Sequence, residues 1–338
     1  MIPVTVLTGY LGSGKTTLLA NLLRTPEFAR TAVIINEFGE VGIDHDLVET
    51  SEESFVELET GCLCCTVRGD LEATLADLVA RREAGSIPAF ERIVVETSGL
   101  ADPAPLVNAI MAETGRGSGI LLDGIVTTVD AVNGLATLAR EPQSMRQVAV
   151  ADRLILTKTD LLPDGPDHAL MAEITRLNPR AQLAAAEKGS VEPLFLVANP
   201  DGAPNPSDWN IADAETAPPA EPRHDNGVTC IAIHRRGPIP ALALTLLLET
   251  LAEHLGADLL RLKAIVHVAE HPSRPAVLHG VQHVFHEPEW LTRWPSDDRT
   301  SRFVLIGRNL SRLWFDALVD AVIAEVGEVA IAPRPPAP

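Results

Sequence analysis

Apolar runs of strand length alternate with helix-like patterns along residues 1–198. Short apolar runs bounded by turn residues predict buried strands, and apolar residues spaced three and four apart predict amphipathic helices. The predicted strands cover residues 2–7, 31–35, 92–95, 124–129 and 153–156, with a strand-like run at 54–58. The predicted helices cover residues 17–23, 69–82, 105–113 and 168–177.

Strands separated by helices predict an α/β fold, with a mostly parallel sheet covered by helices on both faces. The carboxyl ends of parallel strands meet at one edge of such a sheet, and ligands bind there. The residues that follow each predicted strand are therefore the first candidates for chemistry.

The pattern changes at residues 199–227, which carry six prolines and little apolar periodicity. Such a segment is typical of a semi-extended linker. Beyond it, strands at 228–234, 261–268, 276–284 and 302–307 and helices at 239–255 and 310–325 predict a second unit. We expect residues 228–330 to form a smaller α+β domain on an antiparallel sheet, followed by a disordered Pro-rich tail at 331–338.

The segment TGYLGSGKTTLL at 8–19 fits the P-loop pattern G-x-x-x-x-G-K-[ST] and lies between a predicted strand and a predicted helix. Its small residues let backbone N–H groups surround a polyphosphate at a helix N-terminus. Lys15 is expected to reach the β- and γ-phosphates, and the Thr16 hydroxyl is expected to bind Mg²⁺. The predicted nucleotide-binding residues of this loop are Gly9, Gly12, Ser13, Gly14, Lys15, Thr16 and Thr17.

The segment VVETSG at 94–99 ends a buried strand in an acidic residue. In P-loop enzymes this acidic residue contacts Mg²⁺ or its water, and a following glycine N–H meets the γ-phosphate. Glu96 is the longer counterpart of the more usual Asp. We therefore assign Glu96 to the magnesium site and Gly99 to the γ-phosphate.

The segment LILTKTD at 154–160 resembles the guanine-specificity element N-K-x-D, with Thr157 in the place of Asn. A carboxylate at Asp160 can accept both N1–H and N2–H₂ of guanine, whereas adenine presents an acceptor at N1. The Lys158 stem can lie along the plane of the base. These residues predict that the nucleotide is GTP or GDP.

The segment GCLCCTVR at 61–68 places Cys62, Cys64 and Cys65 in a predicted loop. Three neighbouring thiolates favour Zn²⁺ or Cu(I) over Mg²⁺. In an extended segment Cys65 would point away from the other two, so ligation by all three requires a turn. With no fourth sulfur nearby, an open or nucleotide-gated site is favoured over a closed structural one; buried small hydrophobes and a redox pair are the alternatives.

Composition narrows the class of partner. The chain of 338 residues has a net charge of −19, which argues against binding nucleic acid or an anionic membrane. Its hydrophobic content of 46% and charged content of 22% are ordinary for a globular protein. Residues 1–7 enter the first strand directly, without the features of a signal peptide, and no run is long enough to span a bilayer. We expect a cytoplasmic protein.

Taken in order, the segments GYLGSGKTT, NEFGEVGIDHDL (36–47), GCLCCTVRGDL, ETSGLADPAP and TKTD resemble those of the CobW-type P-loop GTPases. RLKAIVHV and SRFVLIGRNL are similar to that family's second domain. The family is associated with zinc handling, cobalamin biosynthesis and nitrile hydratase activation. The resemblance implies that Glu37, and Glu40 with it, lies near the cysteines or the γ-phosphate. Glu37 is our candidate for the residue that orients the attacking water, and Asp44 is the alternative. Glu37 is also a candidate ligand of the transition metal.

The resulting hypothesis is a GTPase that binds a transition metal, Zn²⁺ or Co²⁺, at the cysteines and delivers it to a client apo-metalloprotein. Lys15, Thr16, Glu37 and Glu96 are its predicted catalytic residues. A GTP-dependent activator, scaffold or metal sensor with little hydrolysis is the main alternative. A P-loop small-molecule kinase is the third, although it would need an acceptor pocket in place of the TKTD and cysteine segments. The sequence leaves the oligomeric state open, with a homodimer as one choice.

Overall fold

The computed structural model describes residues 1–36, 56–57, 63–67, 71–197 and 227–331. The chain divides into two compact units, Met1–Ala203 and Pro204–Pro338. The predicted linker, apart from residue 227, and the predicted tail, apart from residue 331, lie outside the described residues.

The first unit is built on an eight-stranded sheet in the order β3-β4-β2-β5-β1-β6-β7-β8. Neighbouring strands run parallel, except that β3 is antiparallel to β4 at one edge. The prediction of a mostly parallel sheet is confirmed. The strands are β1 (Ile2–Gly9), β2 (Thr31–Asn36), β3 (Val56–Glu57), β4 (Leu63–Val67), β5 (Arg92–Thr97), β6 (Ile120–Asp130), β7 (Arg153–Thr157) and β8 (Gln182–Ala185).

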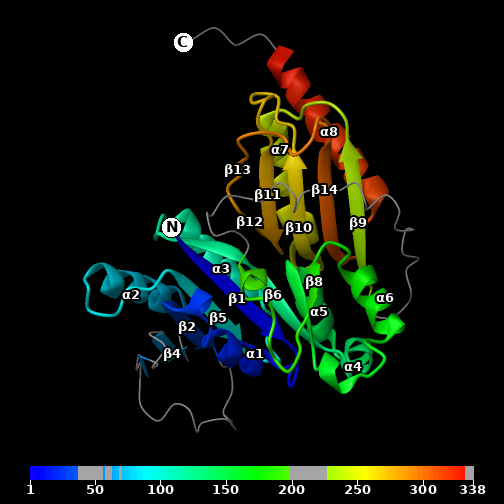
Figure 1. Ribbon diagram of the computed structural model, residues 1–338. Helices are drawn as coiled ribbons and strands as arrows, with labels where there is room; N and C mark the ends of the chain where they lie inside the picture. Colours follow the sequence, from blue (N-terminus) through cyan, green and yellow to red (C-terminus); the bar gives the residue numbers. More distant parts are fainter. Residues whose placement is uncertain (37–55, 58–62, 68–70, 198–226, 332–338) are drawn as a thin grey trace. The chain divides into compact units, whose positions relative to one another are not determined.

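Helices cover both faces of this sheet, as predicted (Figure 1). Val126 on β6 packs in the cluster that contains the leucines of α1, whereas the next residue, Thr127, donates a hydrogen bond to Gln147 on α5. Since successive strand residues point to opposite faces, α1 and α5 lie on opposite sides. The helices are α1 (Lys15–Leu22), α2 (Leu71–Glu83), α3 (Ala104–Gly115), α4 (Gly134–Arg140), α5 (Pro142–Val150) and α6 (His168–Leu177), with short 3₁₀ turns η1 (Pro26–Phe28), η3 (Thr159–Leu161) and η4 (Pro193–Leu196).

The second unit contains an antiparallel sheet in the order β12-β11-β10-β14-β9, with β13 beside β11. The predicted single strand at 276–284 is wrong, because the chain turns back at Gln282, whose φ is 53°. The elements are β9 (Val228–Arg235), α7 (Ala241–Leu255), η7 (Gly256–Asp258), β10 (Leu259–Val266), β11 (Ala276–Val281), β12 (Val284–Phe285), β13 (Glu289–Trp290), β14 (Ser301–Arg308) and α8 (Arg312–Ile331).

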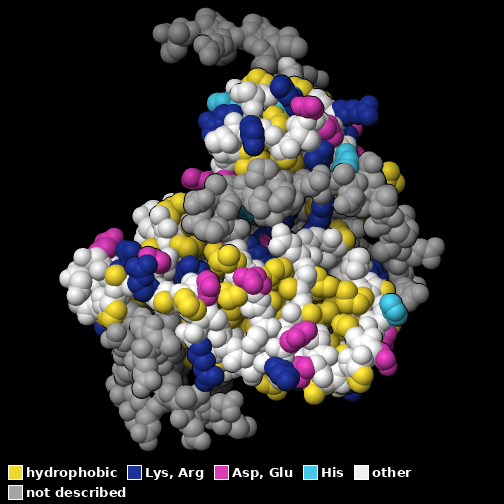
Figure 2. Space-filling model, in the orientation of Figure 1, with side chains coloured by type: hydrophobic (Ala, Val, Ile, Leu, Met, Phe, Trp, Pro, Cys, Tyr) yellow, Lys and Arg dark blue, Asp and Glu magenta, His cyan; other side chains and the backbone are white. Residues whose placement is uncertain are grey.

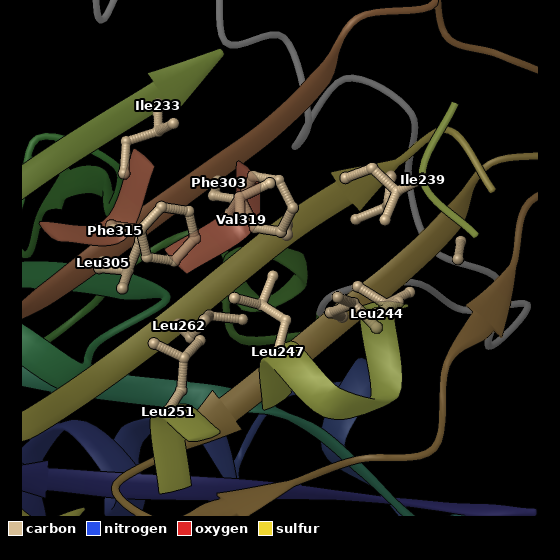
Figure 3. Packing of buried hydrophobic residues seen from close by; sticks show 14 of the residues in the cluster. Ile233, Ile239, Leu244, Leu247, Leu251, Leu262, Phe303, Leu305, Phe315 and Val319 are labelled. Atoms are coloured by element: carbon tan, nitrogen blue, oxygen red, sulfur yellow. The ribbon is translucent and has the colours of Figure 1, made fainter. Parts of the chain in front are cut away.

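Helices α7 and α8 pack on one face of this second sheet and bury its main apolar core (Figure 3). Phe303 of β14 and Phe315 of α8 meet with ring centroids 5.4 Å apart, and both are essentially fully buried. Leu247 and Leu251 of α7 complete the contact from the neighbouring helix. This α+β arrangement agrees with the predicted class of the second unit.

The surface of the first unit mixes charges of both signs. On the face that Figure 2 shows, basic and acidic side chains lie interspersed among hydrophobic ones. Within the described part of the chain, none of the helices combines the length and the apolar character that a bilayer span requires.

Phe315→Ala should destabilise the second unit by about 3–5 kcal/mol, because it removes a fully buried ring and leaves a cavity. Leu313→Ala, two residues earlier on the same helix, removes a side chain that is 82% exposed and should change stability by less than about 0.5 kcal/mol. Urea unfolding followed by tryptophan fluorescence compares the two variants. Equal midpoints for both variants would contradict the assigned core.

Candidate functional site

The loop that follows β1 wraps tightly around the ends of its neighbouring strands. A Cβ added to Gly9 would lie 2.3 Å from Thr128 Oγ1 and 2.6 Å from the Thr128 carbonyl oxygen. Gly14 precedes α1 with a φ of 88°, in the left-handed region that glycine adopts without strain. The glycines of this segment therefore allow both the close approach and the turn into the helix.

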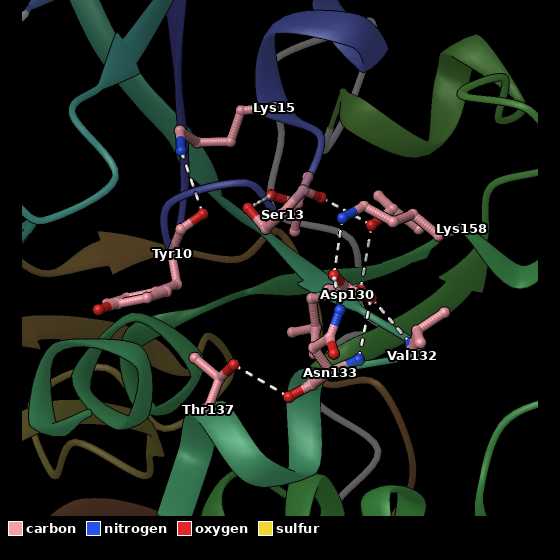
Figure 4. Close-up of polar contacts among 11 residues, drawn as sticks. Tyr10, Ser13, Lys15, Asp130, Val132, Asn133, Thr137 and Lys158 are labelled. Atoms are coloured by element: carbon pink, nitrogen blue, oxygen red, sulfur yellow. Dashed lines mark hydrogen bonds and ion pairs between the residues drawn. The ribbon is translucent and has the colours of Figure 1, made fainter. Parts of the chain in front are cut away.

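Lys15, the first residue of α1, turns back across the loop (Figure 4). Its Nζ donates to the Gly9 carbonyl at 2.9 Å and to the Tyr10 carbonyl at 3.4 Å. The Lys15 side chain is buried, and its ammonium adds positive charge beside the N-terminus of α1. The backbone N–H groups of the first helical turn, which lack helical partners, point to the same place. This arrangement is typical of an anion-binding loop.

Thr16 and Glu96 meet beside that loop. Thr16 Oγ1 donates to Glu96 Oε1 at 2.7 Å, and Glu96 is only 5% exposed. The contact exists because β5 lies next to β1, with Leu7 and Glu96 in register. A hydroxyl and a buried carboxylate that converge in this way are the oxygen ligands Mg²⁺ prefers, so these residues fit the predicted magnesium site.

Gly99 lies against the phosphate-binding loop. A Cβ added at this position would lie 2.7 Å from both the backbone nitrogen and the Cα of Leu11. No side chain fits in that space without moving backbone. The segment that follows β5 is thus in direct contact with the loop that follows β1.

Hydroxyl groups hold the loop in place from three neighbouring strands. The Ser13 and Thr128 hydroxyls lie 2.7 Å apart, and Thr97 donates to the Thr8 hydroxyl at 2.8 Å. Thr157, at the end of β7, donates to the Ser13 carbonyl at 2.6 Å. Thr157 stands where the guanine element usually has Asn. Its hydroxyl therefore makes the hydrogen bond that joins this element to the phosphate loop.

Lys158 is paired with Asp130 at the end of β6 (Figure 4). The Lys158 Nζ lies 2.7 Å from Asp130 Oδ2, and Lys158 has a φ of 60°. Burial by itself would raise the pKa of Asp130, but hydrogen bonds from Lys158, from both nitrogens of Asn133 and from the Val132 N–H outweigh it, and the pKa is lowered. The carboxylate therefore stays charged and fixes the ammonium, while the aliphatic stem remains available to a base.

Asp160 lies on η3 with its carboxylate exposed, and it faces a turn that the sequence analysis missed. Asp160 Oδ1 accepts a hydrogen bond from the Lys188 N–H at 3.2 Å. Asn21 of α1 donates to the Gly189 carbonyl at 2.9 Å, which ties the turn to the helix of the phosphate loop. Two successive left-handed residues, Lys188 and Gly189, form the turn, and this Lys-Gly pair after a strand was the available sequence signal.

The cysteines differ from the prediction in one respect. The backbone of residues 63–67 is strand β4, so Cys64 and Cys65 lie in a strand and the predicted loop is wrong there. Cys64 pairs in register with Val33 of β2, and Cys65 pairs with Ile34. Sequence patterning missed this strand because it is short and carries no alternating apolar pattern. Cys62, Glu37, Glu40 and Asp44 lie outside the described residues.

Thr157→Val keeps the shape of the side chain but removes the hydroxyl that donates to the Ser13 carbonyl. Leaving that buried acceptor without this donor costs about 1–3 kcal/mol, so we expect triphosphate affinity to fall about tenfold in calorimetric titration. Thr157→Ser retains the hydroxyl and should bind nearly as the wild type does. If the valine variant also bound like the wild type, this link would not support the loop.

Comparison with known proteins gives matches over both units. Residues 3–185 match the family described as CobW/HypB/UreG, nucleotide-binding domain, and residues 228–323 match the cobalamin synthesis protein CobW C-terminal domain. The chain is 32% identical over 317 residues to the zinc chaperone YjiA of Escherichia coli, which covers 91% of this chain and 95% of that relative. It is 34% identical over 217 residues to zinc-regulated GTPase metalloprotein activator 1 of Schizosaccharomyces pombe, covering 62% of this chain and 52% of that relative.

A solved structure agrees with these matches. The crystal structure of Zn(II)-bound YjiA GTPase from Escherichia coli superposes with a TM-score of 0.71 at 30% sequence identity, covering 95% of this chain and 98% of that one. The chain therefore belongs to the CobW family of P-loop GTPases.

Proposed function

We propose that this chain is a GTP-binding and GTP-hydrolysing metallochaperone that carries a transition metal to a client metalloprotein. The observation that carries the proposal is the convergence of three elements at one sheet edge. Lys15 and Thr16 follow β1, Glu96 ends β5, and Asp160 follows β7. This is the set of groups that a guanine nucleotide with its magnesium ion requires.

In the proposed nucleotide site each residue has a separate task. The backbone N–H groups of the Gly9–Thr17 loop and the Lys15 ammonium bind the phosphates. Thr16 and Glu96 would hold Mg²⁺, which neutralises phosphate charge when it is bound. The Gly99 N–H is directed to the γ-phosphate, and Glu37 orients the attacking water.

Base selection rests on Asp160 and on the turn at Lys188 and Gly189. The Asp160 carboxylate accepts from N1–H and N2–H₂ of guanine, and the Lys158 stem lies along the base. The hydrogen bond from the Lys188 N–H to Asp160 orients the carboxylate, and Asn21 anchors the same turn. Adenine would place an acceptor opposite this carboxylate, so ATP should bind weakly.

The cargo metal is proposed to bind Cys62, Cys64 and Cys65, with Glu37 as an additional ligand. Because neighbouring residues of a strand point to opposite faces, ligation by all three cysteines requires β4 to give up its extended form at Cys64 and Cys65 when the metal binds. Zn²⁺ is the first choice, because thiolates suit it and the relatives include proteins named zinc chaperones; Co²⁺ is the alternative. Only β2 separates β4, which carries Cys64 and Cys65, from β5, which carries Glu96. Two strand spacings amount to about 10 Å, which is close enough for one ligand to affect the other.

The client is proposed to be an apo-metalloprotein, and the chain to work in the cytoplasm as a monomer or a homodimer. The name of the yeast relative, a GTPase metalloprotein activator, favours a second form of the same idea. In that form the chain activates a client as a GTP-dependent scaffold or metal sensor, with little hydrolysis of its own. Turnover measured with and without metal and client separates the two forms.

Asp160→Asn should lower GTP affinity about 100-fold and leave the weak ATP affinity unchanged, because an amide opposes two guanine donors with only one acceptor. Asp164→Asn, which changes an exposed Asp just beyond η3, is the matched control and should bind GTP normally. Competition titrations with GTP, GDP and ATP measure the selectivity. A variant that still preferred GTP would place guanine recognition elsewhere.

Replacing Cys62, Cys64 and Cys65 together by Ser should abolish tight zinc binding, since a hydroxyl is a far poorer ligand than a thiolate near pH 7. GTP binding should persist, but zinc should no longer change GTP affinity. In the wild type we expect a mutual effect of about 5- to 150-fold, the usual range of allosteric coupling.

Cys230→Ser is the matched control for the triple variant, because it makes the same chemical change at a cysteine that belongs to the second unit. It should retain one zinc per chain and the full mutual effect in anaerobic titrations. A triple variant that still bound one zinc per chain with native affinity would disprove the cysteine site. Independent zinc and GTP affinities in the wild type would disprove the coupling alone.

A further inference from the structure

Two consecutive residues of α5 hold the segment that follows Glu96. Gln147 is fully buried, and its Nε2 donates to the Gly99 carbonyl at 3.2 Å and to the Ala101 carbonyl at 3.1 Å. Arg146 Nη1 donates to Asp102 Oδ2 at 3.0 Å. Residues 99–102 are therefore fixed by side chains from a helix more than forty positions further along the chain.

The helix that supplies these contacts is itself fixed to the sheet. Thr127 of β6 donates to the Gln147 carbonyl at 2.8 Å, and both residues are buried. Asp102 also accepts from the Ala104 N–H at 3.0 Å, at the start of α3. The contacts thus connect β6, α5 and α3 through the segment 99–102.

Gln147 is an unfavourable choice for packing alone. Its Oε1 is buried and has no hydrogen-bond partner among the described residues. A buried amide oxygen without a partner costs free energy, whereas an apolar side chain of the same size would avoid that cost. The benefit of the glutamine lies in its two N–H groups, and both of these are directed to the backbone of Gly99 and Ala101.

The segment held in this way contacts the phosphate loop, because a Cβ on Gly99 would lie 2.7 Å from the Leu11 nitrogen. Any displacement of Gly99 changes its distance from that loop. Gly99 also lies three residues beyond Glu96, which accepts the Thr16 hydroxyl. Gln147 holds the Gly99 carbonyl, and this contact restrains the plane of the peptide that joins Gly99 to Leu100.

We propose that Gln147 and Arg146 are positioning residues that hold Gly99 in place for the γ-phosphate of bound GTP. This inference rests on the proposed GTPase function and deepens it. Neither residue is assigned a contact with the nucleotide. Gln147 acts through the carbonyls of Gly99 and Ala101, and Arg146 acts through the Asp102 carboxylate. Because GDP has no γ-phosphate, the two residues should matter for GTP affinity and for turnover but not for GDP affinity.

Arg146→Gln tests the proposal at a partly exposed position where folding is not at risk. The matched control is Arg176→Gln on α6, which breaks an ion pair of 2.6 Å with Glu173. The two pairs are similarly exposed: the side chains of Arg176 and Glu173 are 27% and 29% exposed, and those of Arg146 and Asp102 are 30% and 24% exposed. Calorimetry with GTP and with GDP, together with phosphate release, gives both affinities and kcat. We expect Arg146→Gln to lower GTP affinity relative to GDP affinity about 5- to 10-fold, to lower kcat by a similar factor, and to leave GDP affinity unchanged. Arg176→Gln should alter none of these three quantities.

Gln147→Met, which keeps the length of the side chain but removes both donors, should give a larger loss of the same kind when thermal melting shows that it is folded. Unchanged ratios in Arg146→Gln, or equal losses of GTP and GDP affinity, would overturn the inference. A wild-type chain that neither binds nor hydrolyses GTP, with Lys15→Ala as the blank, would refute the proposed function itself. Normal wild-type turnover with an unaltered ratio in the variants would refute only the positioning role.

Discussion

The site depends on how closely the backbone of the phosphate loop approaches the ends of the neighbouring strands. Side-chain carbons at Gly9 or Gly99 would lie within 2.7 Å of the atoms they face. This distance is far below van der Waals contact, so glycine is required at both positions. The close approach sets where Lys15 and Thr16 lie relative to Glu96, and therefore the geometry of the proposed phosphate and magnesium sites.

Apart from the Lys15 ammonium, the side chains that hold this tight loop are uncharged. Ser13, Thr128 and Thr157 supply hydroxyl contacts of 2.6–2.7 Å around it. Ionised carboxylates in those places would repel the phosphates, and because they only accept hydrogen bonds they could not donate to the Ser13 carbonyl as Thr157 does. Hydroxyl groups avoid this repulsion, because each can donate or accept without adding negative charge. The acidic residues are placed at the margins, with Glu96 beside Thr16 and Asp130 beside Lys158.

The sequence predicted those parts of the structure that local patterns encode. The phosphate loop and Asp160 follow apolar strands, Glu96 lies near the end of one, and all three belong to recognisable motifs. The structure places all three at the carboxyl ends of the parallel strands. Sequence reasoning missed α5, the turn at Lys188 and Gly189, and the contacts of Gln147. The contacts of α5 join distant segments, which periodicity cannot reveal, whereas the turn had a local signal in its Lys-Gly pair. Strand β4 was missed for a local reason: it is only five residues long, and its sequence LCCTV does not alternate between apolar and polar residues.

Strand β5 connects the two ligand sites of the proposed function. On one side, its carboxyl end continues into the segment that Gln147 and Arg146 hold. On the other side, Ile35 of β2 is in register with both Glu96 of β5 and Thr66 of β4, next to Cys65. In the proposed function, a γ-phosphate bound at Gly99 would restrain the end of β5, and a metal bound at β4 would restrain the strand that lies beyond β2. Linkage then requires that the metal change the affinity for GTP by the same factor by which GTP changes the affinity for the metal.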